Sequence, residues 1–250
     1  MAVFQIYKKL GETPLQSLGR LRAKEGLSQN HPLTYAGRLD PMAEGVMIAL
    51  SDEDVHRKDE FTGLDKTYTL DVLWGIETDT YDLLGLPTAR GPGTAREVST
   101  EDFVGIFDQS YPPYSSKSVE GKQLWQWARE GRIGEVDVPS KQVTIHSIER
   151  CGDHSTSADE LSRVVQHRLS LVEGDFRQEE IGFAWEQVLR RKGPTSYEDV
   201  FVISRFVVSC SSGTYMRSLA HEMGKKKECG ACAFWIRRER VGKYGLEEFV

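Results

Sequence analysis

The stretch that most constrains this chain is residues 33–50, with the sequence LTYAGRLDPMAEGVMIAL. Within it, Arg38 and Asp40 stand on a turn bounded by a glycine and a proline, and the apolar run 46–50 follows soon after. An apolar run of this kind after turn residues predicts a buried strand. The sequence therefore predicts a charged pair on a stiff loop at the edge of the hydrophobic core.

Two interpretations of Asp40 follow from the residues alone. A carboxylate held rigidly beside an arginine stays ionised and can act as a nucleophile or a general base. An aspartate before a proline can equally be a structural residue of a surface turn. Without a further observation, the structural interpretation is favoured for an unspecified Asp-Pro pair.

The rest of the chain mixes strands and helices without a βαβ rhythm or a repeat. Alternation in 66–75 predicts a strand with Tyr68, Leu70, Val72 and Trp74 on one face. Further strands are predicted at 3–9, 141–150, 163–174 and 199–210, and helices at 13–26, 99–110, 123–131, 176–192 and 213–227. Residues 91–99 are predicted to form a glycine–proline loop. This irregular order predicts an α+β fold with a large, mostly antiparallel sheet.

The charge distribution bears on the class of partner. The net charge of -6 taken alone argues against binding to nucleic acid. Segment 213–243, however, holds eight Lys and Arg against three Glu. Because binding to a phosphate backbone responds to the local field, this segment predicts one basic RNA-binding face. The alternative is that these basic residues only form the solvent-exposed end of a helix.

Other features narrow the class of protein. The pair Cys229 and Cys232 forms a lone CxxC without a second pair of ligands, so no metal site is predicted. No run approaches the roughly 20 apolar residues of a membrane-spanning helix. The first residues lack the apolar core of a signal peptide. The sequence therefore predicts a cytoplasmic protein with no membrane segment.

Five segments, in the same order along the chain, resemble the TruB branch of the pseudouridine synthases. The catalytic-loop motif is AGRLDPMAEGV, and the tyrosine strand with its following loop is DKTYTLDVLWGIETDTYDLLG. The three later motifs are YPPYSSKSVEGKQLWQWAREG, CSSGTYMRSLAHEMG and RRERVGKYGLEE. Five ordered motifs are far more specific than any one of them.

The resemblance implies a pseudouridine synthase fold, with a bent central sheet and flanking helices. It implies that the chain converts the T-loop uridine at position 55 of tRNA to pseudouridine, binds the T-arm stem-loop as a monomer, and needs no metal or organic cofactor. Asp40 would be the catalytic aspartate. The residues implied to contact the substrate are Tyr35, Arg38, Tyr68, Lys117, Tyr215 and Arg217. Within the basic segment 213–243, the charge count predicts that Lys225, Lys226, Arg237 and Arg238 contact the RNA backbone.

Three departures from the family pattern accompany the resemblance. Tyr35 occupies the place of a histidine that helps to extrude the base, and its ring is predicted to supply the stacking. Segment 151–200 is longer than usual, which predicts an insertion into a single catalytic domain, 1–250. No C-terminal PUA-like domain is recognised. An alternative function from another class is a T-arm-binding tRNA folding factor whose chemistry is secondary or absent; only turnover separates the two.

Overall fold

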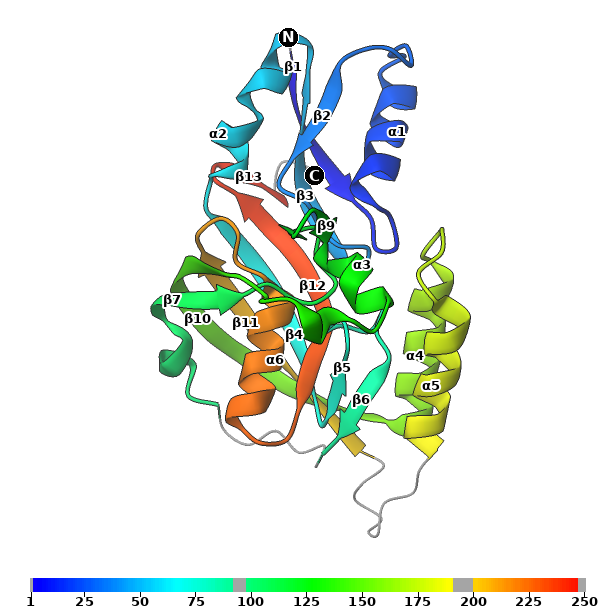
Figure 1. Cartoon of the computed structure of the whole chain (residues 1–250). Helices are drawn as coiled ribbons and strands as arrows, with labels where there is room; N and C mark the ends of the chain where they lie inside the picture. The colour runs from blue at the N-terminus through cyan, green and yellow to red at the C-terminus, as the bar shows by residue number, and fades with distance from the viewer. Residues whose placement is uncertain (1, 92–97, 191–199, 247–250) are drawn as a thin grey trace.

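The computed structural model describes residues 2–91, 98–190 and 200–246. One twisted sheet dominates this part of the chain (Figure 1). Its strands, from edge to edge, are β1 (Ala2–Lys8), β3 (Ala43–Ser51), β12 (Ala231–Val241), β4 (Lys66–Trp74), β11 (Val200–Cys210), β10 (Ser140–Ser157) and β7 (Gly105–Ser110), with β2 (Leu33–Ala36) on β3 and β13 (Tyr244–Gly245) on β12. Only the β3–β12 pair of these is parallel, so the predicted mostly antiparallel sheet is confirmed.

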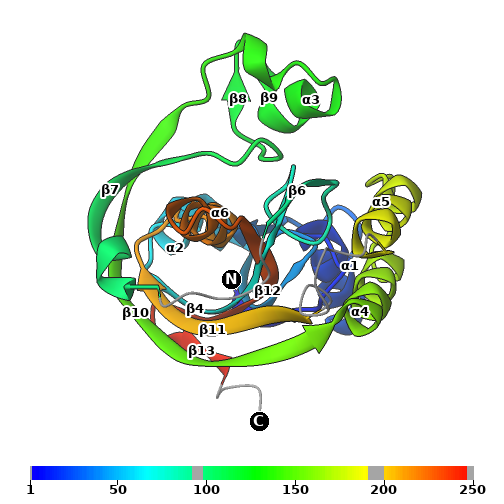
Figure 2. The ribbon, with the colours of Figure 1, turned by 90° about the horizontal axis from the view of Figure 1, so that it is seen from below.

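The helices and two small hairpins surround this sheet. The helices are α1 (Pro14–Lys24), α2 (Lys58–Thr62), α3 (Leu124–Arg129), α4 (Ala158–Ser170), α5 (Gln178–Arg190) and α6 (Met216–Lys226), and the hairpins are β5 (Ile76–Thr78) with β6 (Pro87–Arg90) and β8 (Ser118–Val119) with β9 (Lys122–Gln123). Figure 2 shows the sheet bending around α6, while the segment with β8, β9 and α3 stands off the same face. No helix in the described ranges is long and apolar enough to cross a membrane.

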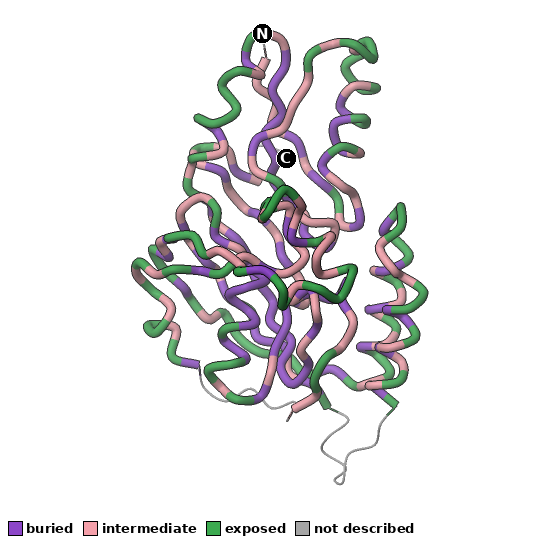
Figure 3. Tube along the Cα trace, viewed as in Figure 1, coloured by how far each residue is buried: buried purple, intermediate pink, exposed green. Residues whose placement is uncertain are grey.

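Local sequence signals explain several of these elements. Thr13 caps α1, and it forms a reciprocal capping box with Gln16. In β4, the face predicted from alternation is confirmed, because Tyr68, Leu70 and Val72 share one apolar cluster with residues of α6. The central strands and the inner side of α6 are accordingly the most buried part of the molecule (Figure 3).

Two predicted elements are wrong. The helix predicted at 99–110 is a short 3-10 turn, Thr100–Phe103, followed by β7. Gly105, the first residue of β7, has a φ of 115°, a conformation that a helix does not allow, and β7 pairs with β10. The strand predicted at 163–174 is mostly helix α4, because Leu161, Val165 and Leu169 recur every fourth residue and face the core. Most of the predicted loop 91–99 lies outside the described residues, which exclude 92–97.

The segment predicted to be an insertion, 151–200, contains the end of β10 and the helices α4 and α5. Its residues 191–199 lie outside the described part of the chain. The two helices bury Leu161, Val165, Ile181 and Trp185 in a second apolar cluster with residues of β4 and β11. The helix pair therefore belongs to the packed body of the protein. That it is an insertion stays a prediction, as does the assignment of 1–250 to one catalytic domain.

Gly45 supports a close backbone contact between β3 and β12. Its φ is 115°, and a Cβ atom there would lie 2.3 Å from the carbonyl oxygen of Arg238. We expect Gly45→Ala to lower the free energy of unfolding by about 3 kcal/mol or more, because strain and overlap add. Gly19→Ala in α1 is the control, since no atom lies within 4 Å and alanine favours a helix by about 1 kcal/mol. Urea unfolding of both variants checks this; equal midpoints would contradict it.

Candidate active site

Asp40 lies on the loop between β2 and β3, at the wall of a cleft of about 700 Å³. The cleft is lined by the Asp40 loop, by the start of β4, by the loop after β5, by the segment around Tyr114, and by the start of α6. The Asp40 side chain is 29% exposed, so it is accessible from this cleft. The charged turn predicted at the edge of the core therefore faces a concave site rather than open solvent.

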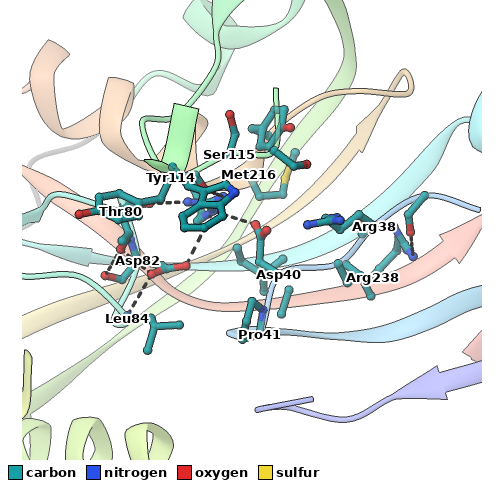
Figure 4. Close-up of a pocket in the computed structure, with 18 of the residues that line it drawn as sticks. Arg38, Asp40, Pro41, Thr80, Asp82, Leu84, Tyr114, Ser115, Met216 and Arg238 are labelled. Carbon is teal, nitrogen blue, oxygen red and sulfur yellow. Dashed lines mark hydrogen bonds and ion pairs between the residues drawn. The ribbon is translucent and has the colours of Figure 1, made fainter. Parts of the chain in front are cut away.

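Arg217 holds the Asp40 carboxylate. It lies in the first turn of α6, and its side chain is only 3% exposed. The guanidinium Nε donates to Asp40 Oδ2 at 2.8 Å, and its Nη1 and Nη2 donate to the carbonyls of Thr80 and Tyr114 at 2.7 and 3.2 Å (Figure 4). Burial alone would lower the pKa of Arg217, but Asp40 and Asp82 together raise it. The arginine is thus a fixed cation that keeps one carboxylate oxygen in place.

A second carboxylate, Asp82, lies 3.7 Å from the same Arg217 Nε atom. Its Oδ1 accepts hydrogen bonds from the Thr80 hydroxyl at 2.7 Å and from the Leu84 amide at 2.9 Å. Burial raises the pKa of Asp82 to about 6, against the opposing effect of Arg217. Asp82 belongs to the TDTYD part of the second motif, and the threonines and aspartates of this loop were the available sequence signal for it.

The position of Arg238 corrects one prediction. Its side chain is 1% exposed, and it donates to the carbonyls of Val46 and Gly37 at 2.7 and 2.9 Å. It therefore anchors the Asp40 loop to the sheet and is not part of an exposed RNA-binding face. Lys8 supports the same loop from β1 by donating to the Ala43 carbonyl at 2.5 Å, and burial lowers the pKa of Lys8 to about 8.

Aromatic side chains form much of the cleft. Tyr68 and Tyr215, both predicted to contact the base, line it together with Tyr114 and Trp125, which the sequence analysis did not select. Burial raises the pKa of Tyr215 to about 12, and nearby Asp40 adds to this effect. Tyr68 is 7% exposed, and burial raises its pKa as well. Neutral rings beside a held carboxylate suit a planar, uncharged base.

Three further residues were predicted to contact the substrate. Arg38 lines the cleft, whereas Tyr35 and Lys117 do not. The Tyr35 ring packs against an apolar cluster of β1, α1 and β3, and its hydroxyl accepts a hydrogen bond from Arg38 at 3.3 Å. Lys117 is exposed, with its ammonium 5.6 Å from the centre of the Tyr111 ring. Base stacking by Tyr35 stays a prediction, and the structure does not bring this ring into the cleft.

The predicted basic face is dispersed. Arg237 projects from β12 opposite to Arg238, and it pairs with Glu239 at 2.7 Å beside the ring of Trp235. Lys225 and Lys226 are exposed near the C-terminal end of α6, roughly 12–14 Å along the helix from Arg217. The expectation that segment 213–243 forms one surface is therefore wrong. Contacts of these three residues with RNA stay predictions.

Among the described residues, no group of three or more His, Cys, Asp or Glu side chains is arranged to hold a metal ion. The side chains of Cys229 and Cys232 are both buried. What the cleft does provide is the carboxylates of Asp40 and Asp82, the buried guanidinium of Arg217 that faces both, and stacking rings. Such a set can fix a planar base and place a carboxylate oxygen against its nucleoside.

Solved structures share this architecture. A chain in the crystal structure of a Cbf5–Nop10–Gar1 complex matches 98% of this chain and 50% of its own length, with a TM-score of 0.55 and 16% identity. A chain of an archaeal box H/ACA sRNP Nop10–Cbf5 complex matches with a TM-score of 0.53 and 15% identity. These likenesses concern the fold alone. They agree with the fold that the motifs predicted.

Comparison of the sequence with known proteins identifies the family of this chain. The model of the TruB family of pseudouridylate synthases (N-terminal domain) matches residues 26–167. A tRNA pseudouridine synthase B from Chlamydia pneumoniae is 33% identical over 239 residues, covering 94% of this chain and 81% of that protein. One from Bordetella pertussis is 30% identical over 244 residues, covering 90% and 80%. The chain therefore belongs to the TruB family of pseudouridylate synthases.

The raised pKa of Asp82 predicts a pH-dependent stability. Between pH 4 and 6 the folded chain keeps a proton on Asp82 that the unfolded chain releases, so stability falls as pH rises through this window. Asp82→Asn has no such proton. We expect the variant to gain roughly 2–3 kcal/mol relative to the parent chain from pH 4 to pH 6. Urea unfolding at several pH values measures this; two parallel pH curves would contradict it.

Proposed function

We propose that this chain is a tRNA pseudouridine synthase that isomerises the T-loop uridine at position 55 of tRNA. The observation that carries the proposal is the Asp40–Arg217 pair, 2.8 Å apart at the wall of an aromatic cleft, in a chain of the TruB family. Relatives named tRNA pseudouridine synthase B match almost its whole length. No metal or organic cofactor enters the proposal.

The geometry supports separate roles for Asp40, Arg217 and the two tyrosines in this reaction. The glycosidic bond must break, the base must turn over, and a carbon–carbon bond must form without loss of the base. Arg217 holds Asp40 Oδ2, so the other carboxylate oxygen is the one available for chemistry. Tyr68 and Tyr215 line the cleft and would retain the detached base by stacking. A water-poor site strengthens each of these interactions.

The alternative function is a T-arm-binding folding factor with secondary or no catalysis. A factor that only binds would not need a desolvated arginine beside two carboxylates, because burying charges is costly unless they are used or well paired. A buried Arg217 that faces both the buried Asp82 and the cleft-exposed Asp40 thus favours catalysis. We further propose that the chain acts as a monomer in the cytoplasm.

The test uses an unmodified tRNA transcript labelled with tritium at C5 of uridine. Pseudouridine formation replaces the C5–H bond by a bond to the sugar, so each turnover releases tritium to water. A T-arm stem-loop and a full tRNA should both release label, and a transcript with cytidine at the target position should not release it from that site. Binding of the T-arm without tritium release would instead support the folding factor.

A further inference from the structure

The loop that joins α4 and α5 reaches the cleft. Its residues Asp175, Phe176 and Arg177 line the wall, although both helices lie in the segment predicted to be an insertion. Asp175 forms an ion pair with Arg129 of α3, across the cleft wall. The helix pair thus supplies part of the site as well as part of the core.

Arg177 makes the closest connection between this loop and the catalytic cluster. Its Nη1 atom lies 2.9 Å from Asp79 Oδ2, and its guanidinium carbon lies 4.5 Å from the centre of the Tyr114 ring. The side chain is 15% exposed, so both contacts are largely shielded from water. A guanidinium that forms an ion pair with a carboxylate and also stacks on an aromatic ring is held in a single orientation.

The backbone at Arg177 is itself unusual. Its φ is 65°, in the left-handed region that side chains other than glycine and asparagine rarely adopt. Its carbonyl accepts a hydrogen bond from the Ile181 amide at 2.9 Å, so the strained residue starts α5. Backbone strain of this kind clusters at active sites and ligand-binding segments.

The two partners of Arg177 belong to the two segments that hold Arg217. Asp79 closes its loop by accepting from the Leu86 amide at 2.8 Å and donating its own amide to the Leu86 carbonyl at 3.0 Å. The next residue, Thr80, presents its carbonyl to Arg217, and the carbonyl of Tyr114 accepts from the same guanidinium. Arg177 therefore connects the two segments whose carbonyls accept from Arg217.

We propose that Arg177 is a positioning residue for pseudouridine formation, supplied by the α4–α5 helix pair. It fixes the Asp79–Thr80 loop against Tyr114, which fixes Arg217 and through it the carboxylate of Asp40. The kinetic part of this inference, the effect on the rate of pseudouridine formation, rests on the proposed function. Its structural part, the rigidity of the loop around Asp79, is independent of any activity.

The test compares Arg177→Asn and Arg177→Lys with the parent chain. Asparagine tolerates the left-handed backbone, so it removes the guanidinium without adding strain. A displacement of about 1 Å can cost about 100-fold in rate, so the single-turnover rate constant at saturating tRNA should fall by about ten- to 100-fold in Arg177→Asn. Binding to tRNA should stay within about threefold, because the contact acts on the protein. Arg177→Lys should recover part of the rate, since it keeps the ion pair but not the stacking.

The matched control is Arg190→Asn, an exposed arginine of α5 that pairs with Glu186. It should leave the rate constant and the melting temperature unchanged. Hydrogen exchange of amides 78–86 gives a second readout and should be faster only in Arg177→Asn. If the parent chain forms no pseudouridine, the proposed function fails and the exchange measurement still decides on Arg177. Parent-like rates and exchange, a pure loss of affinity, or equal losses in the control would overturn the inference.

Discussion

Asp40→Asn should reduce pseudouridine formation below detection while leaving the fold and tRNA binding intact. The amide has nearly the same shape as the carboxylate but is neither a nucleophile nor a base. Arg217 loses one charged partner, yet Asp82 lies 3.7 Å from its Nε and two carbonyls still accept from it. The arginine therefore remains paired, and we expect the melting temperature to stay within a few degrees, about the effect of 1 kcal/mol or less.

Three measurements on this one variant decide between the two interpretations of Asp40. They are thermal melting, affinity for the T-arm stem-loop, and tritium release from labelled tRNA. A structural turn residue would show the reverse pattern, with a lowered melting temperature and turnover within about tenfold of the parent chain, near 1.4 kcal/mol in barrier. That outcome would remove Asp40 from the mechanism.

Arg217→Met should have the second large effect, on stability and on turnover together. The substitution keeps a long side chain but removes the cation that faces Asp40 and Asp82. Breaking a buried pair leaves an uncompensated charge and costs about 3–5 kcal/mol. The carbonyls of Thr80 and Tyr114 also lose their donor. Urea unfolding should show this loss, and single-turnover assays of the folded fraction should show no product.

Arg205→Met is the matched control for this prediction. Arg205 makes two hydrogen bonds to Asp71 at 2.7 and 2.8 Å, but it lies on β11 away from the cleft. Its substitution should lower stability because Asp71 is buried, and it should leave the rate constant of the folded protein unchanged. If Arg205→Met abolished turnover as Arg217→Met does, the loss would reflect general destabilisation and not the position of Arg217.

The sequence predicted the parts of the site that depend on local patterns. Asp40 on its turn before a buried run, Tyr68 on an alternating strand, and Tyr215 with Arg217 at a helix start all depend on neighbours close in the chain. The resemblance to the family motifs then predicted that these residues belong to one site. The structure places Asp40, Tyr68, Tyr215 and Arg217 on one cleft, as those motifs implied.

The remaining parts depend on contacts between distant segments. Asp82 and Tyr114 become important only because they meet Arg217, more than 100 residues further along the chain. The basic segment was misinterpreted because a charge count ignores strand geometry: Arg237 and Arg238 are adjacent in β12, so their side chains must point to opposite faces. The strand predicted at 163–174 was wrong because the buried apolar residues there recur at helical spacing.

The position of β12 in the sheet has a consequence for the order of folding. This strand is made late in synthesis, yet it lies between β3 and β4, which come from the first third of the chain. One edge of each of these two strands stays unpaired until β12 is inserted, and the Asp40 loop lacks its hydrogen bonds to Arg238 until the same strand arrives. Pairings of such long sequence separation make folding slow, because a large loop must close before they form. A nascent chain therefore exposes two unpaired strand edges and has no assembled active site until its last strands are added.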